Sequence, residues 1–216
     1  MAATMTRAYP ETLLSKGRAL LGEAFDYAVN ACGIPGADFA SLFCVSSASA
    51  RMENGETAVI AGKSGAELVL DVLWETTGKT PTVVEWETLG RSAEYWVGWA
   101  VAYYQWYSGR SFSQIFAALP FDELREIYHP LHEAGPDKFA EVADARVRAA
   151  FPGTNLKRLR AAYGCSQAEL ARLSGVGLRS IQMYEQRNKD INKASAETVY
   201  ALSRALGCRM EDLLER

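Results

Sequence analysis

The amino-acid sequence predicts an all-α fold, in which a mostly helical N-terminal domain of residues 1–152 precedes a five-helix C-terminal domain of residues 153–216. Apolar residues recur at spacings of three and four more often than two, which is the periodicity of amphipathic helices. The sequence Phe151-Pro152-Gly153 interrupts this periodicity and marks the predicted boundary. Only the stretch from Thr57 to Ala61, after the Asn54-Gly55 turn signal, is a candidate for a short strand or hairpin.

Helix-capping residues and glycines delimit the elements expected in the N-terminal domain. Ser and Asp accept hydrogen bonds from free N–H groups of a first turn, and glycine ends helices because it adopts left-handed conformations. These signals predict a helix from Glu11 to Ala31 before Gly33-Ile34-Pro35-Gly36, a segment from Phe39 to Val45 capped by Asp38, a helix capped by Ser64 and ended by Gly78, and an extended stretch from Lys79 to Gly90. They then predict a helix from Ala93 to Tyr107 capped by Ser92, short helices begun by Ser111 and Pro120, and a helix from Asp137 to Ala150.

The helix from Ala93 to Tyr107 is unusually aromatic. Its aromatic residues cover more than one helical face, so we expect a central helix that is buried on several sides. A ligand pocket and a dimer surface are the alternatives that the pattern leaves open. The aromatic residues are Tyr95, Trp96, Trp99, Tyr103, Tyr104, Trp106 and Tyr107.

The C-terminal domain has the spacing of a helix-turn-helix. Leu156 and Leu159 form the apolar stripe of a first helix that ends at Gly164, and Ser166 with Glu169 has the capping-box pattern of a second helix, residues 167–174. Gly175-Val176 then forms a tight turn into a third helix, residues 177–187. The second helix is expected to bury Ala168, Leu170, Ala171 and Leu173, and the last two helices are expected from Ala196 to Ala205 before Gly207, and from Met210 to Glu215.

Composition excludes several classes of protein. With 49% apolar and 23% charged residues the chain can fold, so wholesale disorder is excluded. No apolar run reaches the roughly 18 residues that a membrane helix needs, and residues 1–10 lack the apolar block of a signal peptide, so we expect a cytoplasmic protein that makes no membrane contact. The cysteines are widely spaced without a C-x-x-C pair and are expected to be reduced thiols. They are Cys32, Cys44, Cys165 and Cys208.

The formal net charge of −3 hides a division between the domains. Residues 1–152 contain 12 basic and 19 acidic side chains, whereas residues 153–216 contain 11 basic and 7 acidic side chains. Within residues 154–193 the excess is greater, with eight basic side chains against three acidic ones. A polyanionic partner is therefore expected at the C-terminal domain.

Two motifs in the N-terminal domain resemble functional sites without completing them. Gly62-Lys63-Ser64 matches part of a phosphate-binding loop, but that motif needs Gly at position 57, where Thr57 stands, so a helix cap is the expected role of Ser64. His129 and His132 flank Pro130 without an evident third ligand, so they are expected to cap helices rather than bind a metal. No catalytic constellation emerges either, so we expect no enzymatic activity, no cofactor and no metal.

The third helix of the C-terminal domain has two distinct faces. Ile181 and Tyr184 continue the apolar side and are expected to pack on the first two helices. The opposite face lacks acidic residues and is suited to base edges in the major groove of DNA, because Arg pairs with guanine, Gln pairs with adenine, and apolar side chains meet the thymine methyl group. The predicted base-reading residues are Arg179 and Gln182 for polar contacts and Leu178 and Met183 for apolar contacts, and Gln186 shares their face.

Phosphate contacts are expected around this helix. Gln167 opens the second helix, where its side chain and the free N–H groups of the first turn can meet a phosphate. The other predicted phosphate-binding residues follow the third helix, where they could hold the next stretch of backbone. They are Arg187, Asn188, Lys189 and Lys193.

A string of residues in the C-terminal domain resembles the Cro and phage-repressor family of helix-turn-helix proteins, also called xenobiotic-response-element-type regulators. The string comprises Leu159-Arg160, Gly164, Ser166 to Ala171, Ser174-Gly175-Val176, Ile181, Tyr184-Glu185 and Ala205-Leu206-Gly207. The resemblance implies base-reading positions at Leu178, Arg179 and Met183, and a structural ion pair between Arg160 and Glu185. Gly177 stands where the family usually has Ser or Thr, and two of the three base-reading positions are apolar, so the operator sequence is left open.

These observations predict a sequence-specific regulator of transcription that binds double-stranded DNA and is expected to act as a repressor. One helix covers only part of a DNA site, so a homodimer on symmetric half-sites is expected. The N-terminal half is similar to domains that precede repressor-type motifs in gut bacteria, and dimerisation, partner binding or effector binding is its expected role. The alternative is an antitoxin-like interaction protein whose N-terminal half binds a partner protein.

Overall fold

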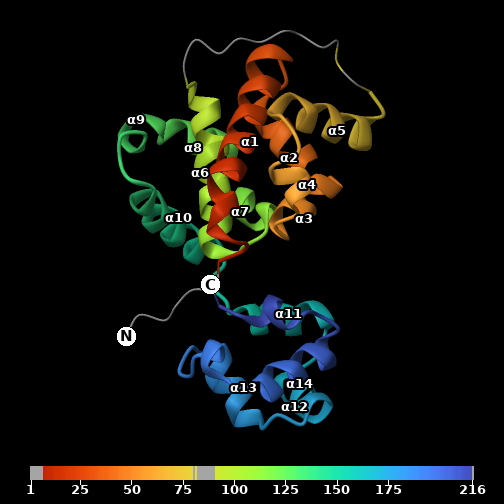
Figure 1. Cartoon of the computed structure of the whole chain (residues 1–216). Coiled ribbons are helices and arrows are strands. Elements are labelled where there is room, and N and C mark those ends of the chain that lie inside the picture. The colour runs from red at the N-terminus through yellow and green to blue at the C-terminus, as the bar shows by residue number, and fades with distance from the viewer. Residues whose placement is uncertain (1–6, 80, 82–90, 216) are drawn as a thin grey trace. The chain divides into compact units, whose positions relative to one another are not determined.

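A computed structural model describes residues 7–79, 81 and 91–215, and these residues form two compact units (Figure 1). The first unit is Met1–Ala150 and the second is Phe151–Arg216, so the division falls two residues before the predicted boundary. The described residues form helices and no strand, which confirms the all-α prediction. None of these helices is both long enough and apolar enough to span a bilayer. Of the predicted extended stretch, all but Lys79 and Pro81 lies outside the described residues.

The helices of the first unit follow one another with short connections. In its first half they are η1 (Glu11–Leu13), α1 (Leu14–Asp26), η2 (Tyr27–Ala31), α2 (Gly36–Val45), α3 (Ser47–Glu53), α4 (Thr57–Ile60) and α5 (Gly65–Thr77). In its second half they are α6 (Ala93–Ser108), α7 (Phe112–Ala118), α8 (Phe121–Glu126), α9 (Tyr128–Leu131) and α10 (Pro136–Ala150).

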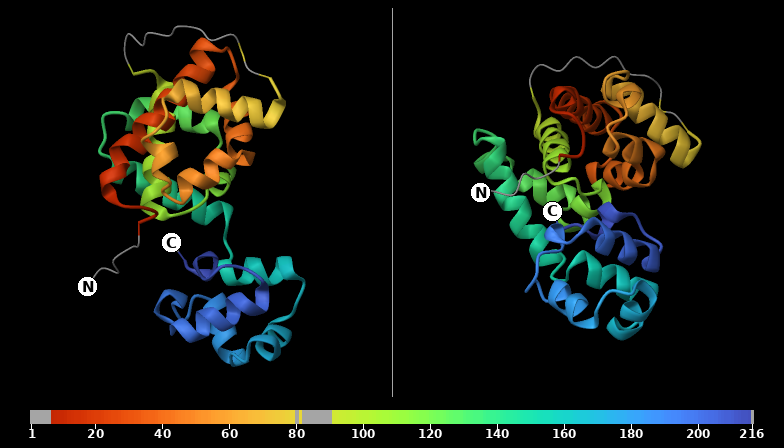
Figure 2. Two further views of the ribbon diagram at one scale, coloured as in Figure 1. Left: turned by 45° about the vertical axis from the view of Figure 1, so that its right-hand side comes forward. Right: turned by 60° about the horizontal axis from the view of Figure 1, so that its bottom comes forward.

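Helices α1 and α6 form the centre of the first unit. Figures 1 and 2 show them side by side, with α2 to α5 on one side and α8 to α10 on the other. Their backbones approach closely at Gly98, where a Cβ atom would lie 2.2 Å from the carbonyl oxygen of Leu21. A larger residue at this position would therefore push the two central helices apart.

The aromatic residues of α6 are mostly core. Trp96, Tyr103, Tyr104 and Trp106 are buried, while the remaining three are half-buried. The polar tips of the two buried tyrosines reach α10, where Tyr103 donates to Asp137 at 2.8 Å and Tyr104 donates to Asp144 at 2.6 Å. Burial, together with the hydrogen bond to Asp137, raises the pKa of Tyr103 to about 12. The hydroxyl groups of Tyr103 and Tyr104 are thus neutral hydrogen-bond donors that link α6 to α10.

Local capping signals predicted most helix starts correctly. Ser64, Ser92 and Ser111 each accept a hydrogen bond from the third residue of the helix that they begin. Gly78 ends α5 with φ of 68°, as predicted. Ser64 therefore has the helix-capping role expected for it.

Two predictions for the first unit were wrong. The candidate strand from Thr57 to Ala61 is instead the short helix α4, because Val59 and Ile60 become buried when the chain turns there. Asp38 lies inside the first turn of α2, whose N-cap is Pro35. The helix expected from residues 11 to 31 is present over that whole range, as a 3-10 turn (η1), an α-helix (α1) and a π-helical turn (η2) in succession.

The second unit contains the predicted five α-helices and one short 3-10 helix. They are α11 (Asn155–Tyr163), α12 (Gln167–Ser174), α13 (Leu178–Glu185), η3 (Ile191–Lys193), α14 (Ala196–Leu206) and α15 (Met210–Leu213). Each of them contributes to one apolar core, whose buried members are Leu156, Leu170, Ile181, Tyr184, Ile191, Val199, Leu202, Leu206 and Leu213. Helix α15 ends at Leu213 and is therefore shorter than the helix predicted for residues 210–215.

The burial pattern of α12 differs from its prediction. Leu170 is fully buried and Ala171 packs partly against the core. Ala168 is exposed, and Leu173 is 47% exposed, so both were wrongly assigned to the core. A helix of eight residues that contacts neighbours along one stripe cannot bury positions on its opposite side.

Candidate functional site

Helix α13 presents a polar surface because its apolar side is anchored in the core. The helix spans Leu178–Glu185, so it is shorter at both ends than the predicted residues 177–187. Gly177 is its N-cap and makes no side-chain hydrogen bond to the first turn. Ile181 and Tyr184 are buried, as predicted, which turns the opposite side of α13 toward solvent.

The four predicted base-reading residues lie on this opposite side with different exposure. Leu178 is 40% exposed, and Arg179 is exposed as well. Gln182 and Met183 are half-buried. Within the described part of the chain Arg179 has no hydrogen bond or ion pair, so its guanidinium group is free to meet a ligand.

The only acidic residue of α13 is withdrawn from the exposed face. The side chain of Glu185 is 3% exposed and accepts two hydrogen bonds from Arg160 of α11, at 2.6 Å from Nε and 2.9 Å from Nη2. The bidentate geometry joins the first helix of the unit to the end of α13. Arg160 Nη1 also donates to the carbonyl oxygen of Cys165 at 2.8 Å, which extends the link to the start of the helix-turn-helix.

Gln167 completes this network and is less available to a phosphate than its sequence position suggested. Its Nε2 donates to Glu185 Oε2 at 2.8 Å, so the side-chain amide is directed to the ion pair. The first turn of α12 is also occupied in part, because Ser166 and Glu169 form the predicted capping box. The proposed phosphate contact of Gln167 thus depends mainly on the remaining backbone N–H groups of that turn.

The network contributes to the stability of the second unit in a way that depends on pH. Burial opposes the ionisation of Glu185, but the hydrogen bonds from Arg160 and Gln167 outweigh burial and lower its pKa below the usual value. A carboxyl group whose pKa is lower in the folded state stabilises the fold above its unfolded pKa. That contribution is lost as the pH falls through the folded-state pKa.

We therefore expect the difference in unfolding free energy between the wild type and Glu185→Gln to be constant above about pH 4.3, the ordinary pKa of Glu, and to shrink below it. Hydrogen exchange of residues 151–215 at a series of pH values measures this difference. A difference that does not vary with pH would contradict the role assigned to the ionised carboxylate.

Three of the predicted phosphate-binding residues make local contacts in the loop after α13. Asn188 Nδ2 donates to Gln186 Oε1 at 3.1 Å. Lys189 Nζ lies 5.2 Å from the centre of the Tyr184 ring. Lys193 Nζ lies 3.8 Å from Asp190 Oδ2, and the side chain of Lys193 is 79% exposed. Such contacts between exposed groups are weak, so these cations can turn to another anion at little cost.

Arg187 is the fourth residue and differs from the others in its backbone. It is the only non-glycine among the described residues with positive φ, at 58°. Its Nη2 lies 3.5 Å from Glu215 Oε2. Neither property could be read from local sequence signals, because left-handed residues after a helix are usually Gly or Asn.

A cleft of about 330 Å³ brings the loop and the start of α13 together. Lys189 lies on its wall with Gly177 and Ser180 from the beginning of α13. Thr198, from the first turn of α14, also lines the cleft. Glu197 also lines the cleft, so hydroxyls, one ammonium group and one carboxylate share a concave surface beside the polar face of α13.

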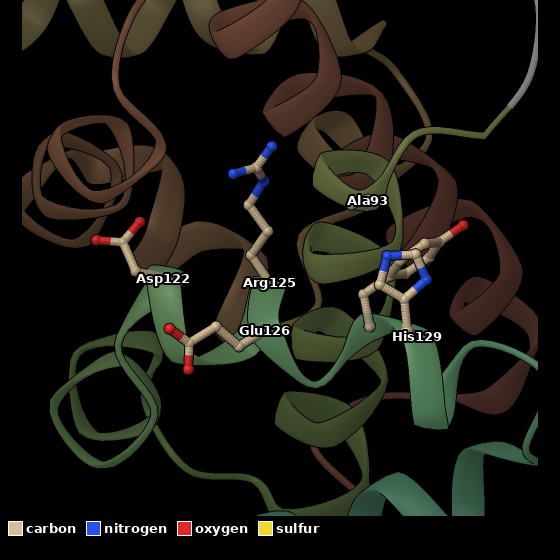
Figure 3. Close-up of a pocket in the computed structure, with 6 residues that line it drawn as sticks. Ala93, Asp122, Arg125, Glu126 and His129 are labelled. Atoms are coloured by element: carbon tan, nitrogen blue, oxygen red, sulfur yellow. The ribbon is translucent and has the colours of Figure 1, made fainter.

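His129 of the first unit lies at a different cleft, of about 370 Å³ (Figure 3). Asp122 and Glu126 point to one side of this cleft and His129 lies on the other, with Arg125 between them. Arg125 donates to the buried Glu94 at 2.8 Å. Across the described residues no group of three potential ligand side chains could hold a metal ion.

Both histidines were expected to cap helices; His132 has this role, whereas His129 lies within α9. His132 Nδ1 lies 3.0 Å from the carbonyl oxygen of His129 and 3.2 Å from that of Tyr128, and the His132 ring stacks on Tyr128 at 4.6 Å between ring centres. Both contacts lie at the end of α9. The ring thus closes a helical turn.

Comparison with known proteins identifies the second unit. Residues 156–213 match a family model described as helix-turn-helix. No curated protein and no solved structure matches the chain. The matched segment runs from α11 to α15 and includes the α12–α13 pair described above. It is a domain of the kind found in DNA-binding transcriptional regulators, and the first unit lies outside the match.

Proposed function

We propose that this protein is a sequence-specific transcriptional repressor that inserts α13 into the major groove of double-stranded DNA. One observation carries the proposal: the exposed face of α13 contains Arg179 and Gln182 and no acid, because Glu185 is buried in its ion pair. Arg and Gln are the side chains best suited to bidentate contacts with guanine and adenine, and Leu178 and Met183 can meet thymine methyl groups.

The surroundings of α13 support a duplex rather than a small ligand. Lys189 and Lys193 follow the helix in the chain, where they can contact phosphates on the same strand segment. The exposed face of α13 carries the polar side chains of Arg179 and Gln182, whereas small-molecule sites are mostly apolar. We also propose that the protein acts as a homodimer, because the eight residues of α13 can cover only one half-site.

The test is selection of bound sequences from random double-stranded DNA by the full chain. We expect one conserved half-site, repeated with two-fold symmetry at a spacing of about one helical turn or a multiple of it. Light scattering of the free protein measures the dimer directly. Recovery of random sequence after several rounds would refute sequence-specific binding.

Lys193→Ala is expected to weaken binding to the selected site and to random DNA by the same factor. It should also reduce the slope of log affinity against log salt by about 0.9, because one phosphate contact is lost. Lys138→Ala is the matched control, since Lys138 in the first unit is also exposed and also pairs with an acid three residues away. A loss confined to the selected site would contradict a phosphate role for Lys193.

A further inference from the structure

Glu215 lies at the centre of a set of contacts that hold the end of the second unit in place. Asn155 donates its backbone N–H to Glu215 Oε1 at 2.6 Å and its Nδ2 to the carbonyl oxygen of Leu214 at 2.7 Å. Asn192 binds the backbone of Glu215 twice, since its Oδ1 accepts from the N–H at 2.9 Å and its Nδ2 donates to the carbonyl oxygen. The carboxylate is thus held in one place by α11 and η3, which lie far apart in the chain.

The other oxygen of this carboxylate faces the loop after α13. Glu215 Oε2 lies 3.5 Å from Nη2 of Arg187, and the side chains are 25% and 48% exposed. The ion pair is therefore open to solvent and to any anion that approaches the loop. Because Glu215 is also anchored through Asn155 and Asn192, the carboxylate cannot easily withdraw when a competing anion arrives.

Arg187 occupies a backbone position at which its side chain carries a cost. Its φ of 58° is unfavourable for an L residue with a Cβ atom, and glycine would fit with less strain. Strained residues of this kind are found at functional sites more often than elsewhere. The loop therefore presents a guanidinium group beside α13 and, at the same time, a fixed carboxylate that neutralises it.

We infer that Glu215 competes with a DNA phosphate for Arg187 and so limits the affinity of the interface. This inference rests on the proposed function. When a phosphate approaches Arg187, it must displace a carboxylate that stays nearby and repels it. Removing the negative charge frees one cation for the DNA backbone and removes one repulsive contact.

The experiment compares Glu215→Gln with Glu211→Gln in the full chain, on the DNA site selected as above. Both variants remove one negative charge, and Glu211 also pairs with an arginine at 3.5 Å, but that arginine is Arg209 and not Arg187. Glutamine at position 215 keeps a side-chain oxygen for the N–H of Asn155. We expect Glu215→Gln to bind about two- to tenfold more tightly than the wild type at low salt, with a salt slope steeper by about 0.9, and Glu211→Gln to bind like the wild type.

A double-mutant cycle with Arg187→Gln then tests whether the gain in DNA affinity depends on Arg187. In the Arg187→Gln background the effect of Glu215→Gln should fall to that of Glu211→Gln. Asn192→Ala, which loosens the anchor without changing charge, should tighten binding in the same direction. Circular dichroism verifies that every variant keeps its helices.

The inference is overturned if neither Glu215→Gln nor Asn192→Ala binds more tightly than Glu211→Gln, or if the gain persists without Arg187. Weaker binding by Glu215→Gln would also overturn it, because the carboxylate would then position Arg187 for DNA. If the wild type selects no sequence, the proposed function fails, and this inference fails with it. If the wild type selects a site, but Glu215→Gln binds that site with the same affinity as the control Glu211→Gln, the proposed function stands. The competition between Glu215 and phosphate is then refuted on its own.

Discussion

Replacing Arg160 with Gln is expected to lower the free energy of unfolding of the second unit by about 3–5 kcal/mol. The substitution leaves the carboxylate of Glu185, whose side chain is 3% exposed, with Gln167 as its remaining side-chain donor. Burying an ionised group without a counter-charge costs desolvation free energy. Because the carboxylate is exposed to water in the unfolded state, this cost destabilises only the folded state. A small unit of this size cannot lose that much stability and remain fully folded.

The measurement must follow the second unit alone. All five tryptophans lie at or before Trp106, so tryptophan fluorescence reports on the first unit. Hydrogen exchange read by mass spectrometry resolves residues 151–216 separately. Arg158→Gln is the matched control, because Arg158 is exposed on the same helix and donates a hydrogen bond to Asn155 at 3.5 Å rather than to Glu185. Equal protection in the two variants would show that the buried pair does not stabilise the unit.

Replacing Arg179 with Ala is expected to abolish discrimination at one base position of the selected site. A bidentate contact between Arg and guanine contributes about 1–3 kcal/mol of specificity, which corresponds to about 5- to 150-fold in affinity between the correct and the wrong base. The wild type should therefore distinguish the four bases at that position, and the variant should bind all four alike. Arg179 has no other partner within the described residues, so its loss should leave the fold unchanged.

Binding of each single-base variant of the site measures this effect. Arg172→Ala is the control, because Arg172 is exposed on α12 and its removal changes the net charge by the same amount. Arg172→Ala should not alter the preference for any base. If both variants weaken binding to every site equally, Arg179 contacts phosphate and the assignment of the base-reading face is wrong.

Much of the second unit follows from signals that are local in the chain. Ser166 and Glu169 form a capping box because both partners lie within one helical turn. Gly164 ends α11 with φ of 81°, a conformation that favours glycine at this position. The inward position of Ile181 and Tyr184 follows from their spacing of three, which places both on one side of any helix that contains them.

The wrong predictions concern residues for which local composition and tertiary packing favour different structures or different degrees of burial. Val59 and Ile60 are β-branched residues and favour a strand in isolation. In the folded chain they lie in the short helix α4, where both are buried. Ala168 and Leu173 are apolar but exposed, because the core of a small unit has room for only one stripe of each short helix.

The sequence by itself determined that the second unit is a helix-turn-helix, which face of α13 is free of acids, and where the basic charge lies. Only the tertiary structure decided which partners the polar side chains take. Gln167 turns to Glu185, 18 positions away, and Arg187 meets Glu215, 28 positions away. Helical periodicity and capping act over a single turn, whereas contacts over such separations depend on the path of the whole chain around its core.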